Sequence, residues 1–276
     1  MPVTGNKPYH PLSLSIRLHA DGFSFFVCDL QNSSLIRGEH FRRAEDVSLA
    51  DQLLHELSRP DYFNRQIDQC FVLLCGPSTH VPLEEFRRDE AAQLYQFTFS
   101  GEDVSQLRVA YTILPQLECA ELYAVPRDIE EAILQFYPTA RFFASRAVLM
   151  ERLLHHEEDT HQELPSLYVV TEADGYFVCA FQGGHLSFAN TFPVTAAPNA
   201  LYFILKVWQQ LHLDALQNHL VLLTDGSERD QELQRSLAEY LLHADVLTPA
   251  DLFPRVPLAQ EKQVPVDLMA LLLNRI

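Results

Sequence analysis

Two short segments with the same order of residue types mark the positions where this chain could do chemistry. Ala20-Asp21-Gly22-Phe23 and Ala173-Asp174-Gly175-Tyr176 each place a carboxylate beside a glycine and an aromatic residue. Each segment lies between two apolar runs, and an acid followed by glycine is typical of a hairpin turn, because glycine adopts positive φ without steric cost. Two matching carboxylate turns could form the two halves of one catalytic site.

Other side chains could bind an ion or act as nucleophiles. The segment 155–163 holds the densest set of metal-ligand residue types, but it lacks the fixed spacing of an HExxH zinc site, so we expect a solvated linker. Cys75 beside Gly76 is the candidate reactive thiol, although burial as a core residue is the favoured interpretation. Ser78 and Ser227 follow strand ends without an identifiable base. We therefore expect no catalytic residue and no metal site.

The apolar pattern predicts the same order of elements twice. The first half shows three strands, a helix, a short buried strand, and then a further strand and helix, at 12–19, 23–30, 34–41, 46–57, 70–75, 140–144 and 146–156. The second half shows the corresponding elements at 167–171, 175–181, 185–192, 198–211, 220–223, 244–247 and 266–273. The Asp-Gly turn and the short buried strand recur in the same order at similar spacing, which indicates an internal duplication.

The first expected strand alternates strictly between apolar and polar residues. The apolar set is Leu12, Leu14, Ile16 and Leu18, and the polar set is Ser13, Ser15, Arg17 and His19. This pattern is typical of a strand with one buried face.

The two halves differ by one block. We expect a first domain at 1–158 and a second at 159–276, with an inserted subdomain or sheet extension at about 97–125 in the first. The helix expected at 266–273 is apolar at nearly every position, so something must cover it. We expect it to pack on the first domain rather than in a dimer.

Composition excludes several classes of partner. The 276 residues carry a formal net charge of −17, which argues against binding to nucleic acid or to an anionic membrane surface. The N-terminus is polar, unlike a signal peptide, and no apolar run is long enough for a transmembrane helix. Five cysteines without CxxC spacing favour a reducing compartment. We expect a cytoplasmic protein.

A β-β-β-α-β-α-β-α unit present twice resembles the actin-like ATPase superfamily, which includes actin, chaperone ATPases and sugar kinases. The resemblance implies an α/β fold of two ribonuclease H-like domains with mixed sheets and a nucleotide cleft between them. Ala124-Val125-Pro126-Arg127, a helix expected at 128–136 and then Ala140-Arg141-Phe142-Phe143 are similar to the bacterial branch used in division and pilus assembly. As a whole, the chain resembles a bacterial family of unknown function with this fold.

The resemblance also implies where ATP and magnesium would bind. In that superfamily, two hairpin turns approach the phosphates, acids position hydrated magnesium, and a later glycine pair packs against the adenine. The matching positions are Asp21, Gly22 and Ser24 in the first turn, Asp174 and Gly175 in the second, and Asp225, Gly226 and Ser227 in the third segment.

This chain departs from the superfamily pattern at each of these positions. Phe23 stands where a small residue is expected, and the second turn lacks Ser or Thr. The third segment keeps one glycine of the pair, while Gly183-Gly184 is better explained as a hairpin turn. Nine glycines in 276 residues are few for a chain that wraps around a triphosphate.

We therefore expect a cytosolic protein-binding or scaffold module without ATPase activity, with no cofactor and an unidentified protein partner. The alternative is an ATP-dependent switch or kinase that uses Mg-ATP between the domains, through Asp21, Ser24, Asp174 and Asp225. A homodimer formed through the block around 119–125 is a third possibility.

Overall fold

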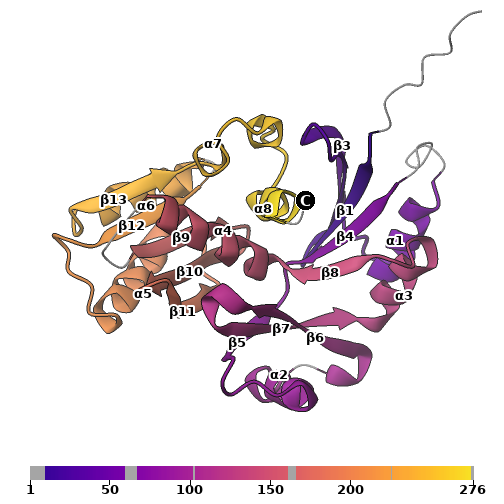
Figure 1. Cartoon of the computed structure of the whole chain (residues 1–276), viewed down its shortest axis with the longest axis horizontal. Helices are drawn as coiled ribbons and strands as arrows, with labels where there is room; N and C mark the ends of the chain where they lie inside the picture. The colour runs from indigo at the N-terminus through magenta and orange to yellow at the C-terminus, as the bar shows by residue number, and fades with distance from the viewer. Residues whose placement is uncertain (1–9, 60–66, 102, 161–165, 225, 275–276) are drawn as a thin grey trace, which may run out of the picture.

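The computed structural model describes residues 10–59, 67–101, 103–160, 166–224 and 226–274, which form two lobes (Figure 1). The first lobe contains β1 (Leu12–His19), β2 (Gly22–Asp29), β3 (Ser34–Arg42), α1 (Leu49–Leu57), β4 (Gln69–Leu74), α3 (Arg127–Phe136), β8 (Arg141–Ala144) and α4 (Ser145–Asp159). The second lobe contains β9 (Ser166–Glu172), β10 (Gly175–Gln182), β11 (His185–Phe192), α5 (Ala197–Gln210), β12 (His219–Leu223), α6 (Glu228–Leu237) and β13 (His243–Leu247). Two further helices are α7 (Pro249–Leu252) and α8 (Val266–Asn274).

The two five-stranded sheets have the same topology. Their strand orders are β3-β2-β1-β4-β8 and β11-β10-β9-β12-β13, with the first three strands antiparallel and the remaining pairings parallel. Each strand of one sheet therefore has a counterpart at the same position in the strand order of the other. The predicted duplication and mixed α/β class are confirmed.

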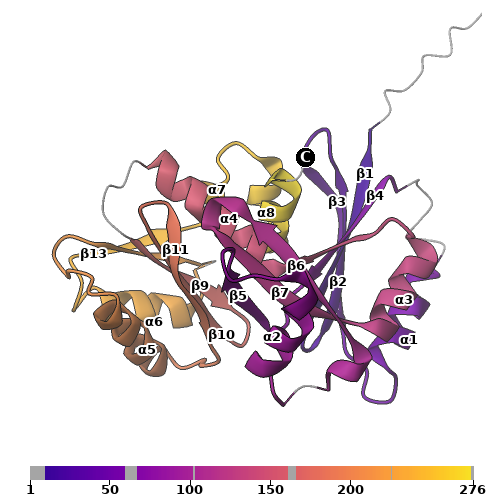
Figure 2. The same cartoon turned by 60° about the horizontal axis from the view of Figure 1, so that its bottom comes forward.

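Helices cover both sheets. In the first lobe α1 contacts α3, and in the second α5 contacts α6, on the outer faces of their sheets (Figure 2). Tyr176 of β10 packs with Ile204 and Trp208 of α5 in the outer core of the second lobe. α4 and α8 lie against each other between the lobes, in a core that draws side chains from both sheets (Figure 1).

Strand β1 is buried on both faces, which corrects the expectation of one buried face. Ser13 and Ser15 are fully buried, like the apolar residues between them. The cause is α8, which returns to the polar face and places Asp267 against Arg17, with 2.9 Å between the Arg17 Nε and an Asp267 oxygen. A polar residue alternation therefore does not mean solvent exposure here.

Helix α8 packs on the first lobe, as predicted. Leu268, Ala270 and Leu271 are fully buried in the core that also holds β1. Asp267 accepts hydrogen bonds from Arg17 and from the Ser145 hydroxyl, the latter at 2.6 Å. Burial opposes the charge of Arg17, but the Asp267 carboxylate outweighs it and holds the Arg17 pKa above its ordinary value. The buried Asp267 carboxylate thus links α8 to β1 through its ion pair with Arg17.

The inserted block is larger than the expected 97–125. It forms a three-stranded antiparallel sheet, β5-β7-β6, covered on one face by α2 (Ala91–Thr98). Its strands are β5 (Ser78–Pro82), β6 (Leu107–Leu114) and β7 (Cys119–Pro126). The apolar pattern does not predict β5, because β5 is only five residues long and ends in proline.

Two helix boundaries also differ from expectation. α1 begins at Leu49 rather than at 46, because the Ser48 side chain accepts a hydrogen bond from the Asp51 backbone and caps the helix there. α4 continues to Asp159, so most of the expected linker at 155–163 is helical, and 161–163 lie outside the described residues. Among the helices that the structure describes, none is long and apolar enough to cross a membrane.

Candidate functional site

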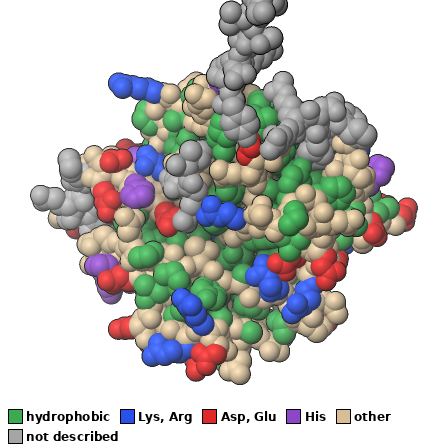
Figure 3. Space-filling view, turned by 45° about the vertical axis from the view of Figure 1, so that its right-hand side comes forward, with side chains coloured by type: hydrophobic (Ala, Val, Ile, Leu, Met, Phe, Trp, Pro, Cys, Tyr) green, Lys and Arg blue, Asp and Glu red, His purple; other side chains and the backbone are tan. Residues whose placement is uncertain are grey.

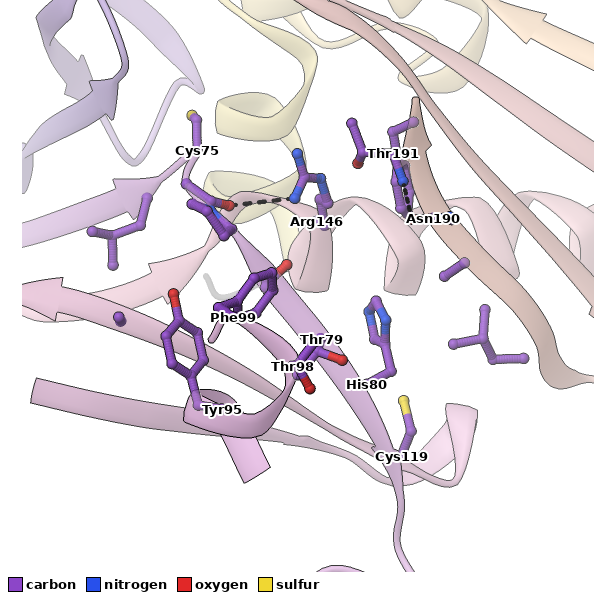
Figure 4. Close-up of a pocket in the computed structure, with 18 of the residues that line it drawn as sticks. Cys75, Thr79, His80, Tyr95, Thr98, Phe99, Cys119, Arg146, Asn190 and Thr191 are labelled. Atoms are coloured by element: carbon purple, nitrogen blue, oxygen red, sulfur yellow. Dashed lines mark hydrogen bonds between the residues drawn. The ribbon is translucent and has the colours of Figure 1, made fainter. Parts of the chain in front are cut away.

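A large hollow lies where the inserted sheet meets both lobes. It has a volume of about 1070 Å³. Its walls come from the ends of β1 and β4, the first turn of α4, strands β5 and β11, and helix α2. In Figure 4, Tyr95 enters from α2 and Phe99 from just after it, Thr79 and His80 from β5, and Asn190 and Thr191 from β11. We call this hollow the interlobe cavity.

The first predicted turn is held by a chain of hydrogen bonds. Exposed Asp21 accepts a 2.5 Å hydrogen bond from His19 Nδ1, and His19 Nε2 lies 3.3 Å from the Ser24 hydroxyl. Ser24 also lies 2.7 Å from His40 Nδ1. The bond with His19 holds the pKa of Asp21 below its ordinary value, while burial lowers the pKa of His40.

This Asp-His-Ser order resembles that of a serine hydrolase triad, but Ser24 is only 1% exposed. A hydroxyl buried to that degree cannot reach a bound substrate. Its oxygen is also already engaged by two imidazole rings. The chain of bonds therefore fixes the turn and leaves no hydroxyl free to donate to a phosphate oxygen.

Gly22 and Gly175 have the same structural role: each leaves room for the backbone of a neighbouring strand. A Cβ atom on Gly22 would lie 2.0 Å from the carbonyl oxygen of Phe41, and one on Gly175 would lie 2.1 Å from that of Phe192. Both oxygens belong to the third strand of their sheet, β3 or β11. Each glycine is thus required by the close approach of a neighbouring strand, without any ligand.

Arg146 occupies the junction between the two turns. From the first turn of α4 it donates to the Gly76 carbonyl, which follows β4 (Figure 4). It also pairs with Glu172 at the end of β9, at 3.1 Å. Asp174, two residues after Glu172, is exposed. Arg146 therefore ties the first lobe to the second beside the second turn, and its charge is already balanced.

The third predicted segment leads from β12 into α6. Ser227 caps α6 by accepting a hydrogen bond from the Asp230 backbone, and the Gly226 N–H donates to the Thr224 hydroxyl. Buried Asp230 in turn accepts from Thr224 and from Tyr176 of β10. These polar groups bind one another. Asp225 lies outside the described residues.

The residues of the first turn do not fit a magnesium-nucleotide site. Ser24 is buried and bonded, and Gly22 is fixed by the sheet. The exposed carboxylates of Asp21 and Asp174 are the groups that a cation could still reach. Nucleotide binding through them stays a prediction that thermal melting with Mg-ATP can test.

Comparison with family models matches residues 8–243 to the family described as "Protein of unknown function (DUF3822)". The chain belongs to the DUF3822 family. Among curated proteins no match is found.

Two solved structures share the fold of this DUF3822 protein. A Bacteroides thetaiotaomicron protein, described as having an actin-like ATPase fold and unknown function, is 21% identical, with a TM-score of 0.76 and 96% of each chain covered. A chain of the PilM-PilN type IV pilus biogenesis complex is 11% identical, with a TM-score of 0.55 and 95% of this chain and 98% of that chain covered. These likenesses confirm the predicted actin-like ATPase fold, and at such identities they show the fold alone.

The candidate thiol of the DUF3822 protein, Cys75, is half-buried in the wall of the interlobe cavity, which corrects the expectation of a core residue, yet it is not a poised nucleophile. Burial and the nearby Asp267 carboxylate together raise the pKa of Cys75 to about 12, although the Arg17 charge works in the opposite direction. The Cys75 sulfur lies 3.8 Å from an Asp267 oxygen. Because the thiolate is the reactive form, this site disfavours nucleophilic attack at neutral pH.

The histidine-rich end of α4 has internal partners. His156 lies 3.2 Å from the Tyr168 hydroxyl, and Arg152 lies 3.9 Å from Asp159. Glu157 is buried beside β9, and burial raises its pKa to about 8, although a hydrogen bond from the Ser166 backbone works in the opposite direction. A buried glutamate that keeps its proton at neutral pH is the unusual feature of this segment.

We expect Glu157→Gln to stabilise the DUF3822 protein increasingly as the pH rises. Between the ordinary pKa of glutamate in the unfolded chain, about 4.3, and the folded value of about 8, only the folded state keeps the proton, so wild-type stability falls. The advantage of the variant should grow by about 5 kcal/mol up to the upper value and then level off. Urea unfolding across this pH range measures it. The exposed neighbour variant Glu158→Gln should show no such trend, and a pH-independent difference for Glu157→Gln would refute the assignment.

Proposed function

We propose that this protein is a protein-binding module that works without nucleotide hydrolysis, and that the interlobe cavity binds an extended segment of a partner protein. The observation that carries the proposal is the pair of strands in the cavity wall. β5 pairs only with β7, and β11 only with β10, among the described strands. Both are therefore edge strands, and both line the cavity.

Edge strands offer backbone groups that an extended peptide can use. An unpaired edge presents a row of N–H and C=O groups, and adding one strand to it is a common mode of peptide recognition. A hollow of about 1070 Å³ is large for a small-molecule site, and an extended chain advances about 3.3 Å per residue, so several residues of a partner fit. Apolar side chains such as Tyr95, Phe99 and Leu186 would contact its alternate side chains.

The comparisons are compatible with this role. One structure that shares the fold is a chain of the PilM-PilN complex, whose description is that of an assembly rather than of a catalyst. The five cysteines, Cys28, Cys70, Cys75, Cys119 and Cys179, are all free, which suits a reducing compartment. On the face of the first lobe shown in Figure 3, basic side chains lie scattered beside acidic ones rather than in a patch. We therefore propose a cytosolic protein that binds proteins rather than nucleic acid.

Selection from a random peptide library displayed on phage tests the proposal. We expect recovered peptides to bind the wild-type chain with micromolar Kd, and Thr79→Trp, which fills the cavity from β5, to weaken them by roughly tenfold or more. Glu239→Trp, on an exposed position outside the cavity lining, is the matched control and should leave binding unchanged. Failure to recover any peptide, or equal binding by both variants, would overturn the proposal.

A further inference from the structure

The floor of the interlobe cavity holds a group of buried polar atoms without hydrogen-bond partners. Within the described part of the chain, Ser78 Oγ, His80 Nε2 and both carboxylate oxygens of Glu121 lack such partners. Strand register places His80 of β5 opposite Glu121 of β7, and Ser78 opposite Tyr123, so the three side chains share one face of the inserted sheet. We call Ser78, His80 and Glu121 the floor cluster.

Glu121 is the member that most needs a partner. It is 0% exposed, and His80 Nε2 lies 3.7 Å from one of its oxygens, beyond hydrogen-bond distance. An ionised carboxylate without hydrogen bonds in a protein interior is strongly unfavourable, whereas a cation that donates to it recovers most of the lost hydration. The site is therefore complementary to a cationic donor.

The floor cluster borders the cavity. Ser78 and His80 line it, and the His80 ring points into it between Thr79 and Cys119 (Figure 4). Glu121 lies beside His80 on the same face of the inserted sheet, on the neighbouring strand.

We propose that the floor cluster binds the cationic side chain of a lysine or arginine in the partner segment, an inference that rests on the proposed function. A lysine ammonium has three N–H donors, and the cluster offers the Ser78 hydroxyl, the Glu121 carboxylate and His80 Nε2 as acceptors when the His80 proton is on Nδ1. The formal net charge of −17 also steers a basic segment toward this chain.

The free protein provides the first test. If the Glu121 carboxylate functions only in binding, it destabilises the free protein, because it is buried there without a hydrogen-bond partner. Glu121→Gln should therefore leave the Tm unchanged within about 1 °C or raise it. A carboxylate kept for structure would lower the Tm when replaced. Glu118→Gln, an exposed acid at the cavity rim, is the matched control and should not change the Tm.

Binding of the phage-selected peptides provides the second test. We expect these peptides to contain a lysine or arginine, and replacing it with methionine should weaken binding to the wild-type chain by roughly tenfold. Glu121→Gln should cause a similar loss, and the two changes together should cost little more than either alone, because they remove the same contact.

The outcomes separate the two proposals. If no peptide binds the cavity, the proposed function fails. If peptides bind it and depend on Thr79 but need no basic residue, or if Glu121→Gln lowers the Tm and leaves their binding unchanged, the protein-binding role stands and the floor cluster assignment is overturned.

Discussion

Replacing Gly175 with alanine is expected to destabilise the protein by about 3 kcal/mol or more, with a similar loss for Gly22→Ala. The added Cβ would lie 2.1 Å from the Phe192 carbonyl oxygen in the second lobe and 2.0 Å from that of Phe41 in the first. Backbone on both sides of each contact leaves no flexible side chain to move away. Thermal melting measures the effect, at roughly 2–4 °C per kcal/mol for a chain of this size.

Gly76→Ala is the matched control for these substitutions. Gly76 also borders the cavity, but a Cβ there meets nothing within 4 Å, so its Tm should change little. If Gly175→Ala and Gly22→Ala fold as stably as Gly76→Ala, the glycines are not required by the sheets. Their presence in both turns would then need a ligand as its explanation.

Removing the Asp267 carboxylate is the second change with a large expected effect. Asp267→Ala should cost about 3 kcal/mol, because it leaves the largely buried Arg17 guanidinium without its counter-charge and frees the Ser145 hydroxyl. The loss should appear in urea unfolding as a lower midpoint with an unchanged slope.

A paired replacement separates the charge from the packing of α8. In Arg17→Met combined with Asp267→Leu, neither charge remains, so most of the stability should return. A double variant as unstable as Asp267→Ala would show that the ion pair is not the cause. Glu261→Ala, an exposed acid just before α8, should have little effect.

The fold could be predicted from sequence because its strands follow local rules. β1 was predicted with both of its bounds, since its residues alternate regularly up to a turn signal. The duplication was visible because both halves repeat the same turn and element order. What local pattern could not show was that β1 is buried on its polar face, because the covering residue Asp267 follows Arg17 by 250 positions.

Much less of the candidate site could be predicted from the sequence. The paired Asp-Gly turns pointed to a nucleotide site, yet the contacts of Gly22 and Ser24 lie within the first sheet. The floor cluster went unnoticed, since Ser78 and His80 meet Glu121 only through the pairing of β5 with β7. No spacing along the chain indicates that register.

We infer that the paired turns of this actin-like fold are shaped by contacts within the sheets and do not bind a nucleotide. Thermal melting with and without millimolar Mg-ATP tests it most directly, because a ligand that binds the folded state well below its concentration raises the Tm by several degrees. We predict no shift, for the wild-type chain and for Asp21→Ala alike. A shift of several degrees that Asp21→Ala abolishes would contradict the account.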